Sequence, residues 1–172
     1  MIYKGRCWKF GDDIGIDSHI MPLKYTLERI SDPEILKNHV MEEVDPEFHK
    51  KVKPGDIIIA GKRFGHGNPH LQGFLGLKGL GLAVLAESIP RGTIRIAVFS
   101  GVPMLPFCED ITKNADDGDY LEVDFLNGSV KNISKNSSLN YEPLDKKILE
   151  IIENGGMKQY LQTQIKGESS DS

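Results

Sequence analysis

The sequence predicts a single α/β domain with an antiparallel hairpin in its C-terminal third. Two apolar runs, residues 56–61 and 82–87, are separated by a helix-length stretch, which is the spacing of a parallel strand–helix–strand unit. Farther along, Asn127-Gly128 lies between two short segments and is a strong hairpin signal. The 172 residues are 39% hydrophobic, enough for one core, and no repeat or linker divides them.

The N-terminal elements follow from local signals. The segment Tyr3–Phe10 is expected to be a strand, and a second apolar segment covers residues 14–21. Asp32 and Pro33 form a favourable helix start, with a side-chain oxygen as cap and proline at the first helical position. We expect that short helix to end near residue 40, and another helical turn to run from Asp45 to about residue 51.

The two apolar runs predict strands that are buried on both faces. Unbroken apolar sequence is typical of a sheet covered by helices on each side, and we expect that arrangement here. The helix between the strands should end near Leu80.

The remaining elements lie after Glu87. They are a helix over residues 93–99, a strand over 104–107, hairpin strands over 120–125 and 129–133, and a helix over 143–154 that Gly155-Gly156 terminates. The polar end of the chain is expected to be disordered, so the domain should cover residues 1–165 and the tail residues 166–172.

Composition narrows the function classes. The formal net charge of −4 is modest and the lysines and arginines are dispersed, so neither nucleic acid nor a membrane surface is expected as partner. No apolar run reaches the roughly 18 residues of a membrane helix, and the N-terminal segment lacks the apolar region of a secretory signal. We therefore expect a cytoplasmic protein. Cys7 and Cys108 should be reduced thiols, and they are too few to hold an iron–sulfur cluster.

The stretch GKRFGHGNPHLQGFLGLKGLG, residues 61–81, is the candidate site for chemistry. Asn68 and Pro69 could cap a helix and occupy its first position without any ligand, and capping is compatible with ligand contact. A metal site at His66 and His70 is a weaker alternative, because no third ligand is evident nearby.

Several segments, in order and correctly spaced, resemble the small subunit family of 3-isopropylmalate dehydratase, the swivelling domain of the aconitase superfamily. They are GRCWKFGDDIGID, SDPEILKNHVMEEVDPEFHKKVKPGDIIIAGKRFGHG, LGLKGLGLAVLAESIPR and SGVPMLP, with a weaker match at LEIIENGGMKQYL. The resemblance covers about residues 3 to 107 and the final expected helix. It implies a three-layer β/β/α swivelling domain.

The resemblance also implies an activity and a partner. Such a chain would be the small subunit of a hydro-lyase that dehydrates a hydroxy-carboxylic acid, and a large subunit would carry a [4Fe-4S] cluster as Lewis acid. This chain would bind no cofactor or metal itself, and it would supply a substrate loop at a helix N-terminus. A small carboxylic acid is the expected substrate.

Carried over by position, the resemblance assigns His70 as catalytic. The implied substrate-binding residues are Gly65, His66, Gly67, Asn68, Pro69, Arg91 and Asp17. Arg91 could instead form a structural salt bridge, and His66 could face the large subunit. The family's Gly-Ser-Ser-Arg-Glu pattern is altered, because Asn68 replaces the base serine and His70 replaces the carboxylate-gripping arginine. We therefore expect a divergent member with a non-standard substrate.

Two questions stay open at this level. The helix after the loop carries Gly73, Gly76 and Gly79 on one stripe, which indicates close approach to the sheet or to a partner, or simply a looser helix. The loss of both family side chains also allows a non-catalytic paralogue that acts as a binding or regulatory module.

Overall fold

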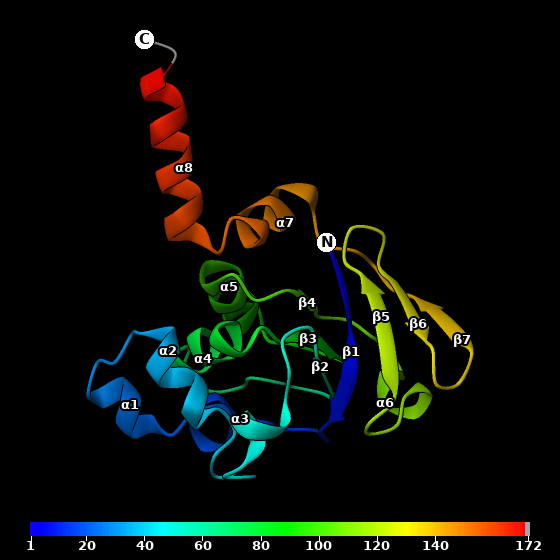
Figure 1. The fold of residues 1–172 in the computed structure, drawn as a ribbon. Helices are drawn as coiled ribbons and strands as arrows, with labels where there is room; N and C mark the ends of the chain where they lie inside the picture. The colour runs from blue at the N-terminus through cyan, green and yellow to red at the C-terminus, as the bar shows by residue number, and fades with distance from the viewer. Residues whose placement is uncertain (171–172) are drawn as a thin grey trace.

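The computed structural model describes residues 1–170, which form one seven-stranded mixed sheet with the strand order β4-β3-β2-β1-β5-β6-β7 (Figure 1). The strands are β1 (Ile2–Lys9), β2 (Ile57–Ala60), β3 (Ala83–Ala86), β4 (Met104–Leu105), β5 (Tyr120–Asp124), β6 (Ser129–Asn132) and β7 (Ser137–Asn140). The predicted strand–helix–strand unit is present as β2, α4 and β3, and the two strands pair in parallel.

The sheet has a parallel half and an antiparallel half that meet at β1. On one side β1 pairs in parallel with β2, in a register that places Cys7 opposite Ile57. On the other side it pairs antiparallel with β5, with Tyr3 opposite Val123. The predicted hairpin is confirmed: β5 and β6 pair through the turn that contains Gly128, whose φ is +73°. The third antiparallel strand, β7, was not expected.

Three layers result, because the antiparallel half curls over one face of the parallel half. Along β2, Ile57 and Ile59 join a core with Leu121, Val123 and other residues of the antiparallel half. Ile58 and Ala60 point to the opposite face and join the core beneath the helices. The burial of β2 on both faces was predicted correctly, but most of the helices cover one face only. The antiparallel strands cover the other face, with Ile111 and Leu149 from two further helices beside them, which gives the β/β/α order.

Helices α1 to α5 belong to the helical layer (Figure 1). The helical segments are η1, a π-helical turn (Ile16–Ile20), α1 (Leu23–Leu27), α2 (Pro33–Leu36), the 3₁₀ turn η2 (Lys37–His39), α3 (Phe48–Lys51), α4 (Gln72–Leu80), α5 (Arg91–Ser100), α6 (Ile111–Asn114), α7 (Lys146–Glu153) and α8 (Met157–Ser170). The predicted cap of α2 is confirmed, since the Asp32 carboxylate accepts a hydrogen bond from the Glu34 amide at 2.9 Å. Helices α1, α6 and α8 were not expected.

The glycine stripe of α4 is explained by contacts inside the chain. A Cβ added at Gly76 would lie 2.6 Å from Cγ2 of Val40, and one added at Gly79 would lie 2.5 Å from the carbonyl oxygen of Pro33. The glycines therefore let α4 lie close to α2 and to the segment after η2, the arrangement seen in Figure 1. Close approach was one of the expectations, but the neighbour is neither the sheet nor a partner.

The C-terminal end differs from the expectation of a tail. Gly155-Gly156 ends α7 as predicted, but α8 follows at once and continues to Ser170, beyond the domain boundary expected at residue 165. In Figure 1 α8 points away from the sheet. The last two residues of the expected disordered tail, 171–172, lie outside the described residues. None of the helices in residues 1–170 combines the length and the apolar character needed to span a membrane.

Candidate functional site

The candidate site lies beyond the carboxyl ends of β1 and β2, where ligands commonly bind in α/β sheets. The chain that leaves β2 runs alongside the chain that leaves β1. Gly65 donates its amide to the Ile14 carbonyl at 2.6 Å, and Ile16 donates to the His66 carbonyl at 3.0 Å. These bonds fix residues 65–70 against residues 13–17. We call residues 65–70 the substrate loop, because the family resemblance implies that role for them.

An exposed ion pair braces the entrance to this loop. Arg63 donates from Nε and from Nη2 to the two carboxylate oxygens of Asp13, the second at 2.8 Å. Both residues have positive φ, 59° and 60° respectively, so the pair links two backbone positions of uncommon conformation. The hydrogen bond from Arg63 lowers the pKa of Asp13. Neither residue was expected at the site, and no sequence signal distinguished the pair from ordinary surface charges.

His70 and Asp17 meet at the centre of the site. The His70 Nδ1 atom lies 2.8 Å from both carboxylate oxygens of Asp17, although 53 positions separate the residues. Both side chains are partly buried, with exposed fractions of 31% and 24%. An ionised carboxylate only accepts hydrogen bonds, so Nδ1 carries the proton that it donates to Asp17. In that tautomer a neutral ring has its acceptor lone pair on Nε2.

His66, by contrast, turns back onto its own chain. Its Nε2 donates to the Asp13 carbonyl at 3.1 Å, and its ring lies 3.3 Å from where a Cβ on Gly15 would be. The two histidines of the loop are thus held by different partners. Within residues 1–170, no group of three or more histidine, cysteine, aspartate or glutamate side chains is arranged to hold a metal ion.

The two glycines of the loop have different surroundings. At Gly65 (φ +76°) an added Cβ would lie 2.5 Å from Cγ2 of Thr93, whose buried hydroxyl donates to the Gly65 carbonyl. The close approach at Gly65 is therefore to α5. At Gly67 (φ +103°) an added Cβ would meet nothing within 4 Å, so the backbone faces open space.

Asn68 and Pro69 do not start the helix, which corrects the capping interpretation. Helix α4 begins at Gln72 with Leu71 as its N-cap, and no side chain caps it. Instead, the His70 amide donates to the Asn68 carbonyl at 2.8 Å, which closes a three-residue turn around Pro69. This turn places His70 next to Asp17. The contact between these two side chains is therefore formed in place of the helix cap that Asn68 and Pro69 favour locally. Asn68 and Pro69 remain exposed.

Arg91 stands at the first position of α5 and is exposed. Among the ion pairs found in the described chain, none involves Arg91, so the structure gives no support for the alternative of a structural salt bridge. Its neighbour Gly92 faces Pro69, where a Cβ on Gly92 would lie 3.9 Å from Cβ of Pro69. The first turn of α5 therefore adjoins the exposed part of the substrate loop.

Residues in and after α1 hydrogen-bond to the start of α4, directly after the substrate loop. Gln72 accepts a hydrogen bond from Thr26 at 3.0 Å and donates to the Ile30 carbonyl at 3.2 Å. Beside it the Tyr25 hydroxyl donates to Glu42 at 2.9 Å, and burial, followed by the bond to Glu42, raises the pKa of Tyr25 to about 12. His39 was expected to serve packing; its ring stacks on Tyr25, with 4.3 Å between ring centroids.

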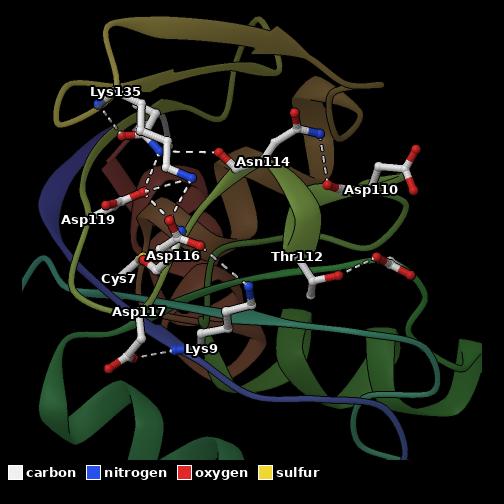
Figure 2. A network of polar contacts seen from close by, with 11 residues as sticks. Cys7, Lys9, Asp110, Thr112, Asn114, Asp116, Asp117, Asp119 and Lys135 are labelled. Atoms are coloured by element: carbon white, nitrogen blue, oxygen red, sulfur yellow. Dashed lines mark hydrogen bonds and ion pairs between the residues drawn. The ribbon is translucent and has the colours of Figure 1, made fainter.

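A second polar cluster surrounds the acidic turn, residues 116–119 (Figure 2). The Asp119 carboxylate accepts hydrogen bonds from the Asp116 amide at 2.9 Å and from the buried Asn132 side chain at 2.7 Å. Asp116 pairs with Lys135 at 2.8 Å. Hydrogen bonds from the Asp116 amide and then from Asn132 lower the pKa of Asp119. The groups of this cluster thus satisfy one another.

Comparison with known proteins identifies the family to which the chain belongs. The chain is 41% identical over 165 residues to the isopropylmalate/citramalate isomerase small subunit of Methanocaldococcus jannaschii, covering 95% of this chain and 96% of that protein. It is 44% identical to the 3-isopropylmalate dehydratase small subunit 2 of Archaeoglobus fulgidus, covering 91% and 93%. The chain belongs to the 3-isopropylmalate dehydratase small subunit family. No model of a known protein family matches the sequence.

The solved structures agree. A crystal structure of 3-isopropylmalate dehydratase from M. jannaschii superposes with a TM-score of 0.89 at 35% identity, with each chain fully covered. The family resemblance and the swivelling-domain fold are therefore confirmed. The chain is a small subunit of a hydro-lyase, and the names of its relatives imply a complex with a large subunit. These relatives do not favour the alternative of a non-catalytic paralogue.

Proposed function

We propose that the substrate loop, with Asp17 and Arg91, forms the part of a composite active site that this subunit contributes. The observation that carries the proposal is the contact between His70 and Asp17, which joins two segments far apart in the sequence at the carboxyl edge of the sheet. The substrate we propose is a small hydroxy-carboxylic acid. The altered loop supports a substrate different from that of members with the Ser-Ser-Arg sequence.

In this proposal His70 is the base. Asp17 holds Nδ1–H, as the carboxylate of a catalytic triad holds its histidine, and leaves the Nε2 lone pair free to accept a proton. The proton would come from the carbon next to the one that carries the hydroxyl group. The imidazolium that forms would be stabilised by the neighbouring Asp17 carboxylate, which stays ionised.

The open side of the loop would bind the substrate carboxylate. Arg91 is a nearby cation with no ion-pair partner in the described chain, and it stands where the first turn of α5 adds unpaired amides and a partial positive charge. Asn68 and the backbone at Gly67 lie exposed beside it. We propose that these groups orient the acid so that its C–H bond faces His70.

The [4Fe-4S] cluster does not fit this chain. Such clusters normally need three or four cysteine ligands, and the chain has two. Both are buried in the core beneath the antiparallel half, and burial raises the pKa of each thiol, which opposes the thiolate form that a ligand requires. We therefore propose that the large subunit carries the cluster, and that the assembled enzyme works in the cytoplasm.

Reconstitution with the large subunit tests this function. The chain is co-expressed with that subunit, and dehydration is measured on a panel of hydroxy-dicarboxylic and hydroxy-tricarboxylic acids. Activity that requires both subunits and falls with His70→Ala supports the proposal. Full activity of a His70→Ala complex would rule out His70 as the base.

A further inference from the structure

A cavity of about 320 Å³ lies between the helices on the side of α4 where α7 turns into α8. Its apolar wall is formed by Leu71, the N-cap of α4, and by Leu75 of α4, Pro33 of α2 and Phe99 of α5. Its other wall comes from the start of α8, at Lys158 and Gln159. We refer to it as the α4–α8 cavity. It is separate from the groups assigned to the substrate above.

The charged groups that line this cavity are all cationic. Lys78 and Lys158 line it, and none of the aspartates or glutamates in the described part of the chain does. Lys78 is partly buried, and burial lowers the pKa of its ammonium group. It donates one hydrogen bond, to the Gly155 carbonyl, and an ammonium group has three donors. An anion in the cavity would therefore complete the coordination of Lys78 and offset the cost of its burial.

A buried hydroxyl group gives independent evidence of an unfilled polar position. Ser100 lines the cavity and is 2% exposed, and its Oγ has no hydrogen-bond partner. A buried polar atom without a partner costs free energy, so such atoms are uncommon in native structures. The first turn of α8 also forms part of the wall, and its position favours negative charge.

Close backbone packing holds the cavity open in one shape. A Cβ added at Gly101 would lie 2.5 Å from the carbonyl carbon of Gly155, so the end of α5 and the turn before α8 lie in direct contact. The Tyr160 amide donates to the Gly156 carbonyl at 3.0 Å and starts α8 at that point. The backbone at this part of the cavity wall is therefore tightly packed.

We infer that the α4–α8 cavity binds a small monocarboxylate with a short aliphatic chain. The carboxylate would lie between Lys78, Lys158 and the start of α8, and the aliphatic chain would lie against Leu75 and Phe99. The volume is at the lower end of the range for ligand cavities, which suits a molecule of this size. This inference does not depend on the proposed base or on the cluster.

The test is a titration of the whole chain with isovalerate, followed by two-dimensional amide NMR. Saturable shifts are expected at Ser100, Gly155 and Lys158. Acetate, which has the charge without the branched chain, should bind about tenfold more weakly or worse, because each buried methylene contributes about 0.8 kcal/mol. Isoamyl alcohol, which has the same branched chain without the charge, should be weaker by about tenfold, the loss of a charge-assisted hydrogen bond.

Variants locate the site. Lys78→Met should weaken isovalerate binding about tenfold through the same lost contact. Lys158→Gln, at an exposed position, should weaken it about threefold, as expected for an exposed charge. Lys131→Met, on the exposed face of β6, is the matched control and should leave binding unchanged.

Three outcomes would overturn the inference. They are shifts confined to residues 65–70, equal binding of acetate and isovalerate, and equal binding by the Lys158→Gln and Lys131→Met variants. The first would assign the carboxylate to the substrate loop instead, which would support the proposed function while removing this site.

Discussion

The substrate loop and the acidic turn both place charged side chains near the carboxyl end of β1, but they differ in the hydrogen-bonding capacity that remains. In the acidic turn every carboxylate has a partner within the chain, since Asp116 pairs with Lys135, Asp117 accepts from the Lys9 amide and Asp119 accepts from Asn132 (Figure 2). In the loop region Arg91 forms no ion pair with the described residues, and His70 contacts Asp17 through one ring nitrogen only.

This difference separates a structural polar cluster from a site. Polar groups that satisfy one another stabilise the connection of β1 to β5 even where they are exposed, as Asp116 is at 66%. Groups with a free donor or acceptor can bind a ligand. If the density of charged side chains were the criterion, the acidic turn would be chosen as the candidate site. The remaining hydrogen-bonding capacity instead favours the substrate loop. The predictions below separate the two regions by activity and by stability.

The largest effect is expected from His70→Ala. Loss of a general base typically lowers kcat by about 100-fold to 10,000-fold, and we expect a fall in that range for the reconstituted enzyme. The measurement is steady-state kinetics with the large subunit present. Asp116→Ala in the acidic turn is the control and should retain the kcat of the unaltered enzyme.

A smaller loss is expected from Asp17→Asn. The asparagine side chain can donate to Nδ1, so it favours the tautomer whose proton is on Nε2 and removes the acceptor lone pair. We expect kcat to fall by about 100-fold while KM changes little, because Asp17 acts through His70. A KM change with an unaltered kcat would instead show that Asp17 contacts the substrate.

For the acidic turn, Asp119→Ala should affect stability and leave kcat unaltered. Removing the carboxylate deprives the buried Asn132 amide and the Asp116 amide of their acceptor, at a cost on the order of 1–3 kcal/mol in the free energy of unfolding. Chemical denaturation at pH 6 measures it. A loss of activity without a loss of stability would contradict the division between the two regions.

The same variant has a pH signature. The folded-state pKa of Asp119 is lowered, so its contribution to stability is complete above the unfolded-state pKa of about 3.9 and is lost as the pH falls through the folded-state value. The difference between Asp119→Ala and the unaltered protein should therefore shrink steadily below about pH 4. Denaturation curves between pH 6 and pH 2.5 test this, and a constant difference would show that the ionised carboxylate is not the cause.

The smallest effect is expected from Arg91→Gln. Loss of one charge-assisted contact with a substrate carboxylate should raise KM by about tenfold and leave kcat nearly unaltered. Arg91 makes no ion pair within the described chain, so the midpoint of thermal unfolding should not change. A lower midpoint with an unaltered KM would show that Arg91 is structural.

Sequence reasoning located the elements whose signals are local. Residues 57–60 and 83–86 are continuous apolar runs, and the dipeptide Asn127-Gly128 is a strong local signal for a hairpin turn. It missed β7, whose sequence is mostly serine and asparagine and which is mostly exposed. The glycine stripe of α4 indicated a close approach, but its spacing could not identify α2 as the neighbour.

The geometry of the candidate site was predicted only in part, for the same reason. Family resemblance placed the loop, Asp17 and Arg91 in one region, yet the contact between His70 and Asp17 depends on how the chain ends of β1 and β2 pass each other. The ion pair between Arg63 and Asp13 joins two positions with positive φ, and neither an arginine nor an aspartate in the sequence indicates that conformation. The turn at Pro69 was misread because asparagine followed by proline is also a good helix start.

The position of β1 has a consequence for how the protein is made. Among the described strands β1 is synthesised first, yet its two neighbours are β2 and β5, so its second edge stays open until residue 124 has left the ribosome. An unpaired strand edge on a nascent chain invites pairing with other chains. Translation that stalls between β2 and β5 should therefore yield aggregation-prone fragments that chaperones must hold, and the full chain should reach its fold only after β5 docks.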